Sequence, residues 1–167
     1  MLASLEDLER ELTELTAPRD EFAAERSIRD AYAARLAEFR PCERVWRTEH
    51  VYYPSLLRGD LRTVDTLNRV RIWEFKIKAS FDGLGQILTY VALARKETEF
   101  SRPVLGVLAA FEFAPELATA IEVLNLGIEL VVLPEPLRLA GQVPASASPV
   151  IIPSIPHFPL SPAAQEE

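Results

Sequence analysis

The apolar residues change their spacing near residue 41, and this change constrains the fold more than any other feature. Residues 18–39 carry apolar side chains at the spacing of an amphipathic helix, namely Phe22, Ile28, Tyr32, Leu36 and Phe39. Beyond Pro41, apolar and polar residues alternate in three runs with short turns between them, at 45–53, 61–67 and 69–78. Short turns favour antiparallel neighbours, so we predict a helix followed by a three-stranded meander with Asn68 at the second turn.

The second half of the chain alternates between helical patterns and unbroken apolar runs. Helices are predicted over residues 82–97 and 114–127, and the apolar runs 104–111 and 128–134 are typical of buried parallel strands. A short helix at 4–15 precedes the rest. The resulting order is two helices, three strands, helix, strand, helix, strand, which predicts an α/β fold with a mixed β-sheet flanked by helices.

Composition divides the chain into three parts. Residues 1–16 are predicted to form an amphipathic helix whose leucines make one stripe, at Leu5, Leu8, Leu12 and Leu15. Residues 5–15 pack either on their own domain or against a second copy or a protein partner. Residues 17–134 are predicted to form the folded core. Residues 135–167 are rich in Pro, Ser and Ala, and we expect them to form an extended tail.

The charge distribution bears on the partners of the protein. A net charge of −7 is unusual for a protein that grips nucleic acid by its phosphates. The charge is uneven, however: residues 1–40 hold ten acidic residues and six arginines, whereas residues 44–78 hold eight basic and four acidic residues. We therefore expect positive charge to gather in this stretch, at the candidate site that its residues form.

Three features predict a cytoplasmic protein without a membrane segment. The only cysteine is Cys42, which excludes an intramolecular disulfide and fits a reducing compartment. No apolar run approaches the roughly 18 residues that span a bilayer. The acidic N-terminal sequence is not typical of a signal peptide.

The run 69–78 carries the residues that point to chemistry. Strand alternation places Glu74 and Lys76 on one face and the aromatic residues Trp73 and Phe75 on the other. A Glu-x-Lys pair alone is common on solvated strands. Asp60, which begins the preceding run, can come opposite Glu74 in a short hairpin, and two converging carboxylates suit Mg²⁺ or Mn²⁺.

Two further sets of residues can reach the same place. Gln86 and Tyr90 are four residues apart, so they share one face of the helix that follows the strand. Glu25 lies on the early helix that would cover the sheet. A rival carboxylate, Asp65, ends the second run, where it suits a hairpin flank better than a metal site.

Together these residues resemble the PD-(D/E)xK phosphodiesterase superfamily, over residues 20–134. The motif corresponds to Gly59-Asp60-Leu61, Glu74-Phe75-Lys76 and Gln86-x-x-x-Tyr90, with Gly59 in place of the proline in the motif's name. The stretch GQILTY resembles the branch that holds recombination exonucleases, CRISPR-adaptation nucleases and NucS-type endonucleases. The resemblance implies a restriction-endonuclease-like fold.

The resemblance also implies a Mg²⁺-dependent deoxyribonuclease. Asp60, Glu74 and the Phe75 carbonyl would hold one or two Mg²⁺ or Mn²⁺ ions, and Lys76 would orient the attacking water. Gln86 would position water or the substrate backbone, and Tyr90 would serve packing or positioning. Glu25 is either an outer-sphere or second-metal acid or a solvated helix charge. The alternative function is a non-catalytic module of the same fold that binds DNA or a protein partner.

Overall fold

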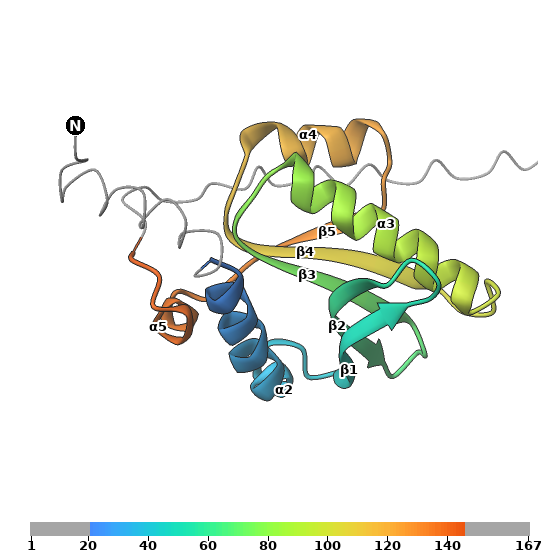
Figure 1. Ribbon diagram of the computed structural model, residues 1–167, viewed down its shortest axis with the longest axis horizontal. Coiled ribbons are helices and arrows are strands. Elements are labelled where there is room, and N and C mark those ends of the chain that lie inside the picture. The colour runs from blue at the N-terminus through green and yellow to red at the C-terminus, as the bar shows by residue number, and fades with distance from the viewer. Residues whose placement is uncertain (1–20, 146–167) are drawn as a thin grey trace, which may run out of the picture.

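The computed structural model describes residues 21–145, and its centre is a five-stranded mixed sheet (Figure 1). The first three strands pair antiparallel in chain order: β1 (Glu43–Tyr52), β2 (Leu57–Asp65) and β3 (Val70–Ala79). β4 (Val104–Phe113) and β5 (Ile128–Val132) then add to β3 in parallel. The predicted meander and the two parallel strands are confirmed. The predicted helix at 4–15 lies outside the described residues.

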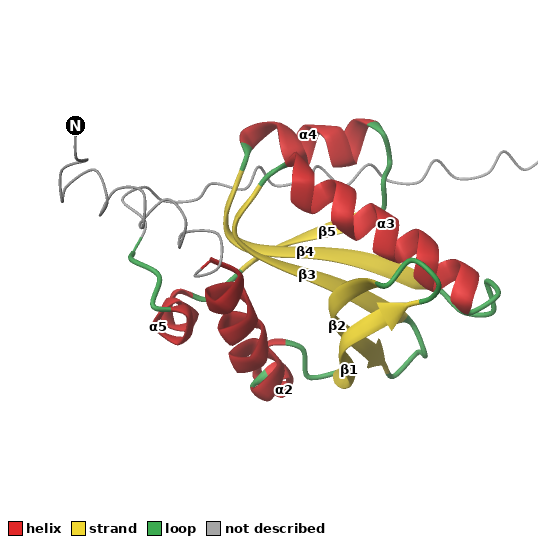
Figure 2. Cartoon of the chain, viewed as in Figure 1, coloured by secondary structure: helices red, strands yellow, loops and turns green. Residues whose placement is uncertain are grey.

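Helices cover both faces of this sheet (Figure 2). α3 (Phe81–Glu97) and α4 (Pro115–Val123) lie on one face. The helical residues 21–34 lie on the other, and a turn at Arg35 leads from them into α2 (Leu36–Phe39). Among residues 21–145, no helix is both long and apolar enough to cross a membrane.

The folded part extends further than the predicted boundary at residue 135. Glu135–Leu137 form the 3-10 helix η1, and Arg138–Gly141 form α5. Leu137 is buried against the helix of residues 21–34, and Arg138 lies over the ring of Phe111 at 4.2 Å. The prediction of an extended tail is therefore wrong for residues 135–141, because one apolar side chain there completes the core. Residues 146–167 lie outside the described part.

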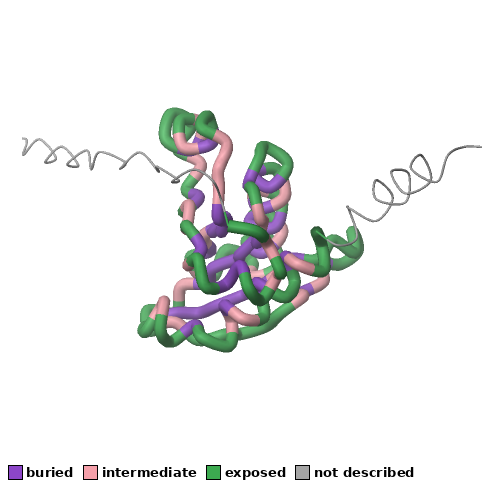
Figure 3. The backbone as a smooth tube through the Cα atoms, turned by 90° about the vertical axis from the view of Figure 1, so that its left-hand side faces the viewer, coloured by how far each residue is buried: buried purple, intermediate pink, exposed green. Residues whose placement is uncertain are grey.

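Side-chain alternation along β3 separates two hydrophobic cores. Val70 and Ile72 pack under α3 and α4, whereas Trp73 and Phe75 pack with Tyr32 and Leu36 on the other face. Buried positions accordingly run along β2, β3 and β4, whereas most of β1 is exposed (Figure 3). Since both faces of the central strands are covered, side chains that face a cavity must lie where a layer of helices ends.

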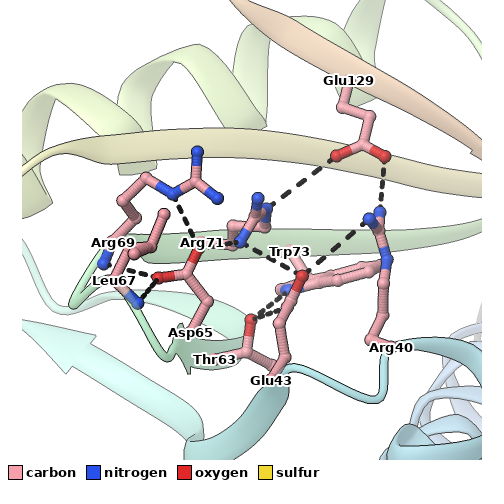
Figure 4. Close-up of polar contacts among 9 residues, drawn as sticks. All are labelled: Arg40, Glu43, Thr63, Asp65, Leu67, Arg69, Arg71, Trp73 and Glu129. Atoms are coloured by element: carbon pink, nitrogen blue, oxygen red, sulfur yellow. Dashed lines mark hydrogen bonds and ion pairs between the residues drawn. The ribbon is translucent and has the colours of Figure 1, made fainter.

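A polar network ties one end of the sheet together on the Trp73 face (Figure 4). The Arg71 guanidinium lies 3.1 Å from both Glu43 and Asp65, and the Trp73 indole donates to Thr63 Oγ1 at 2.9 Å. Asp65 also accepts from the backbone N–H groups of residues 67 and 69. This carboxylate is fully used in closing the β2–β3 turn, so the prediction that Asp65 flanks a hairpin is confirmed.

Two glycines provide a matched test of the packing. A Cβ on Gly106 of β4 would collide with Ile128 and would lie 2.9 Å from Val91 Cγ2, whereas a Cβ on Gly85 of α3 would meet open space. Gly106→Ala should lower the free energy of unfolding by about 1–3 kcal/mol through overpacking. Gly85→Ala should raise it by up to about 1 kcal/mol, because alanine favours a helix. Urea unfolding measures both, and equal effects of the two substitutions would contradict this packing.

Candidate active site

The candidate site forms where β2 and β3 diverge. Their ladder ends at the pair Leu61 and Trp73, so the next residues, Asp60 and Glu74, stand at the fork. There the Phe75 N–H donates to Asp60 Oδ2 at 2.8 Å instead of to a β2 carbonyl. Asp60 and Glu74 are therefore neighbours at the fork, although the ladder no longer pairs them. Asp60 also takes over a backbone partner that the ladder no longer supplies.

Glu25 reaches the same fork from the other face of the sheet. Its carboxylate accepts the Ile77 N–H at 3.3 Å and lies 3.5 Å from Lys76 Nζ. The side chain is buried, which rules out the alternative of a solvated helix charge. Asp60 and Glu25 therefore accept the N–H groups of Phe75 and Ile77, which are two residues apart on β3. These hydrogen bonds fix both carboxylates beside Lys76.

Lys76 is the cation at the centre of these acids. Its Nζ lies 3.0 Å from Glu74 Oε1, in addition to the contact with Glu25. Its side chain is only 16% exposed, so the surrounding groups hold the ammonium in one position. The alternation that set Glu74 and Lys76 on one face of the strand brings them together as predicted.

α3 supplies the remaining predicted residues. Gln86 and Tyr90 face the site one helical turn apart, and the Tyr90 ring stacks on Tyr52 of β1 with centroids 6.0 Å apart. All six predicted side chains line a single cavity of about 410 Å³, namely Glu25, Asp60, Glu74, Lys76, Gln86 and Tyr90. Tyr90 is buried and stacked, as a residue with a packing role would be.

The crowding of carboxylates changes their acidity. Burial, together with the neighbouring Asp60 carboxylate, raises the pKa of Glu74 to about 8. Burial also raises the pKa of Asp60 and that of Glu25. Burial acts to lower the pKa of Lys76, but the carboxylates of Glu74 and Glu25 outweigh it, so the Lys76 pKa rises and its ammonium stays charged. The fork thus holds a permanent cation beside carboxyl groups that resist ionisation.

The oxygens of the cavity fit a hard cation in part. Glu74 Oε2 and Gln86 Oε1 are buried oxygens without a hydrogen-bond partner, and such atoms are normally paired. A divalent cation would satisfy both and would favour the ionised form of Glu74. Across the described residues, however, no three acidic, His or Cys side chains converge closely enough to form a metal cluster by themselves. A cation here would need water, the Phe75 carbonyl or substrate oxygens as further ligands.

Sequence reasoning missed the basic side of the cavity. Arg26 and Arg29 line it from the helix of residues 21–34, and Glu49 and Arg58 line it from β1 and β2. Arg29 stands four residues beyond Glu25 and three beyond Arg26, which are the spacings of neighbours on a helix. This spacing was a signal that links the three residues, but it does not show that they meet the cavity. The expectation that the positive charge of residues 44–78 gathers at the site holds for two of its eight basic residues, Arg58 and Lys76.

Several other basic residues of that stretch serve ion pairs elsewhere. Arg62 pairs with Glu97, and Arg69 and Arg71 pair with Asp65. These pairs neutralise arginines that the sequence alone could not distinguish from free ones. The basic character of the cavity therefore rests on fewer residues than the composition suggested, and two of them come from the acidic N-terminal segment.

The chain is similar to several solved structures. The chain is similar to a repair endonuclease from Pyrococcus abyssi, with a TM-score of 0.51 and 22% identity over 62% of this chain and 46% of that one. An EndoMS in complex with double-stranded DNA gives a TM-score of 0.49 and 18% identity, over 64% of this chain and 45% of that one. EndoMS in its apo form gives 0.48 and 19%, over 64% and 46%.

This chain spans less than half the length of each of these proteins. No protein-family model and no curated protein sequence match it. The similarity to the Pyrococcus abyssi endonuclease confirms the predicted restriction-endonuclease-like fold, a mixed sheet flanked by helices in this order. At this identity the likeness shows the fold alone.

The raised pKa of Glu74 predicts a gain in stability when its charge is removed. Ionising this carboxyl group costs folding free energy, so the cost grows as pH rises from about 4.5, where the unfolded chain loses the proton, to about 8. Glu74→Gln should raise the melting temperature in EDTA, by about 2 °C or more at pH 9 and less at pH 5. Thermal unfolding at both pH values measures this. A variant less stable than wild type at pH 9 would contradict the proposed environment of Glu74.

Proposed function

We propose that this protein is a metal-dependent nuclease of the PD-(D/E)xK type that hydrolyses DNA phosphodiester bonds. One observation carries the proposal: Asp60, Glu74 and Lys76 line one cavity in which Glu74 Oε2 is a buried oxygen without a partner. The likeness of the fold to a repair endonuclease supports a nuclease. The choice of DNA as substrate follows from the resemblance of the motif.

Each residue of the cavity has a role that its surroundings support. Asp60, Glu74 and the Phe75 carbonyl would hold Mg²⁺ or Mn²⁺, which supplies a water of lowered pKa and neutralises charge on the phosphate. Lys76 remains protonated and offers a fixed N–H donor to water or to a phosphate oxygen. Gln86 presents its unpartnered amide oxygen to the same space.

Glu25 and Tyr90 act through other groups. Glu25 holds the Lys76 ammonium and the Ile77 N–H, so of the roles that the sequence suggested we assign it an outer-sphere, positioning role rather than that of a second-metal acid. Tyr90 fixes the wall of the cavity by stacking on Tyr52. Both roles are those of residues that keep the reacting groups in place.

A non-catalytic module of the same fold is the second candidate function. The lack of a three-residue metal cluster within residues 21–145 favours it, as does the use of Asp60 and Glu25 as acceptors for backbone N–H groups. Such a module would bind DNA or a partner without a metal. Calorimetric titration with Mn²⁺ separates the two candidates, because a nuclease site should bind the ion and release protons from Glu74 as it does so.

Two further proposals rest on sequence features alone. A homodimer or partner contact through residues 5–15 follows from the leucine stripe, which lies outside the described residues. A cytoplasmic location follows from the single cysteine, which is free and exposed.

Cleavage of a plasmid and of a linear duplex in Mg²⁺ or Mn²⁺ tests the proposed function. Asp60→Asn and Lys76→Met should each lower the cleavage rate by about 100-fold or more, because each removes charge aimed at the reacting phosphate. Glu116→Gln, on the exposed start of α4 and outside the cavity, is the matched control and should cleave as wild type does. Cleavage that survives both substitutions would overturn the assignment of the site.

A further inference from the structure

Three arginines converge on one carboxylate at the side of the cavity. Arg29 Nη1 donates to Glu49 Oε1 at 3.1 Å, and Arg26 Nε lies 3.4 Å from the same oxygen. Arg58 Nη1 lies 4.0 Å from Glu49 Oε2. All four side chains line the cavity that holds Asp60 and Glu74, so the cluster and the acids of the fork face the same space.

Different elements bring these residues together. Arg26 and Arg29 are three residues apart on the helix of residues 21–34, and Arg58 lies on β2 two residues before Asp60. Glu49 lies on β1 with a backbone φ of 50°, a left-handed conformation that is uncommon for a residue other than glycine. This backbone costs free energy, and strain of this kind concentrates at functional positions.

The cluster is unequal in charge and in exposure. Arg29 is buried and is also fixed by Asp30 at 2.7 Å. Arg26 and Arg58 are more exposed, at 55% and 53%, so both can be reached from outside. Arg29 divides its hydrogen bonds between Glu49 and Asp30. The pairs of Arg26 and Arg58 with Glu49 are exposed, and such pairs contribute little to stability. A structural role for Glu49 alone does not account for three partners.

A phosphate group has the chemistry that this cluster selects. Guanidinium groups bind carboxylates and phosphates with the same forked geometry, so a carboxylate among arginines occupies the place that a phosphate would take. We infer that Arg26, Arg29 and Arg58 form a subsite for a DNA phosphate adjoining the scissile one, and that Glu49 fills this subsite until substrate displaces it. This inference rests on the proposed nuclease function, because it takes the cavity as the place where DNA enters.

An internal carboxylate allows an acidic protein to keep a cluster of arginines ready for a phosphate. Glu49, with Asp30 beside Arg29, offsets the repulsion among the three arginines in the free protein, and DNA binding must break the pairs that Glu49 makes. Removing the charge of Glu49 should therefore tighten DNA binding. Removing a polar side chain that contacts the ligand usually weakens binding. This opposite sign distinguishes a displaced stand-in from a residue that contacts DNA or supports the fold.

Binding of a fluorescein-labelled 20-base-pair duplex, measured by anisotropy in EDTA at several salt concentrations, tests this. Glu49→Gln should lower Kd by about threefold or more and steepen the salt dependence, because more arginine charge is available to phosphates. Glu38→Gln removes the same charge from an exposed pair with Arg35 outside the cavity, and it should bind as wild type does. Arg58→Gln and Arg26→Gln, at exposed positions, should raise Kd.

Specific results would overturn the inference. Glu49→Gln binding no tighter than Glu38→Gln would do so, as would wild-type affinity in both arginine variants or no duplex binding by any variant. Melting temperatures of all variants show whether each remains folded, and the two exposed arginine variants decide the matter if Glu49→Gln unfolds. Because EDTA prevents cleavage, tighter binding by Glu49→Gln in a protein that never cleaves DNA would reject the nuclease function and leave the phosphate subsite intact.

Discussion

The divergence of β2 from β3 is the constraint on which the site depends. Where the ladder stops at Leu61 and Trp73, β3 is still buried between two layers, and its backbone N–H groups still need acceptors. Asp60 and Glu25 provide them, one from the neighbouring strand and one from the helix on the opposite face. The same backbone requirement that stabilises the sheet therefore gathers carboxylates at one point. The cavity opens there because no strand fills the fork.

Gathering acids in this way lowers the stability of the fold. Buried carboxyl groups that share one lysine hold raised pKa values, and at least one oxygen of Glu74 has no partner. Such an arrangement persists because the surrounding cores are large and continuous on both faces of β3. A divalent cation would remove the conflict, since it supplies the positive charge that a single ammonium cannot. Arg26, Arg29 and Arg58 line the same cavity around Glu49, where they outnumber this carboxylate and leave a surplus of positive charge.

Periodicity predicted most of the fold, because each element buries a face with its own repeat. The three-stranded meander, the parallel strands and the helices between them follow from patterns within single segments. The six site residues also came together, since Asp60, Glu74 and Lys76 are close in the sequence of a hairpin and Gln86 with Tyr90 shares one helix face.

What the sequence could not show depends on contacts between distant segments. Arg26 and Arg29 belong to an acidic stretch, and only the packing of their helix on the sheet, with their ion pairs to Glu49 of β1, reveals that they face the site. The burial of Glu25 was not predicted, because a lone charged residue on a helix suggests exposure to solvent. The helix at Arg138–Gly141 was not predicted either, because the proline-rich composition around it suggests an extended chain. Net charge was similarly uninformative, since ion pairs such as Arg62 with Glu97 decide which arginines remain available.

The central claim is that the fork is a cation site, and a crystal soaked in Mn²⁺ tests it most directly. Anomalous scattering at the manganese edge should give a peak bounded by Asp60 and Glu74, with Glu74 Oε2 among the ligands. Glu74→Gln crystals soaked in the same way should show a weaker peak or none. A wild-type crystal without anomalous density at the fork, with Lys76 still paired to Glu74, would contradict this account.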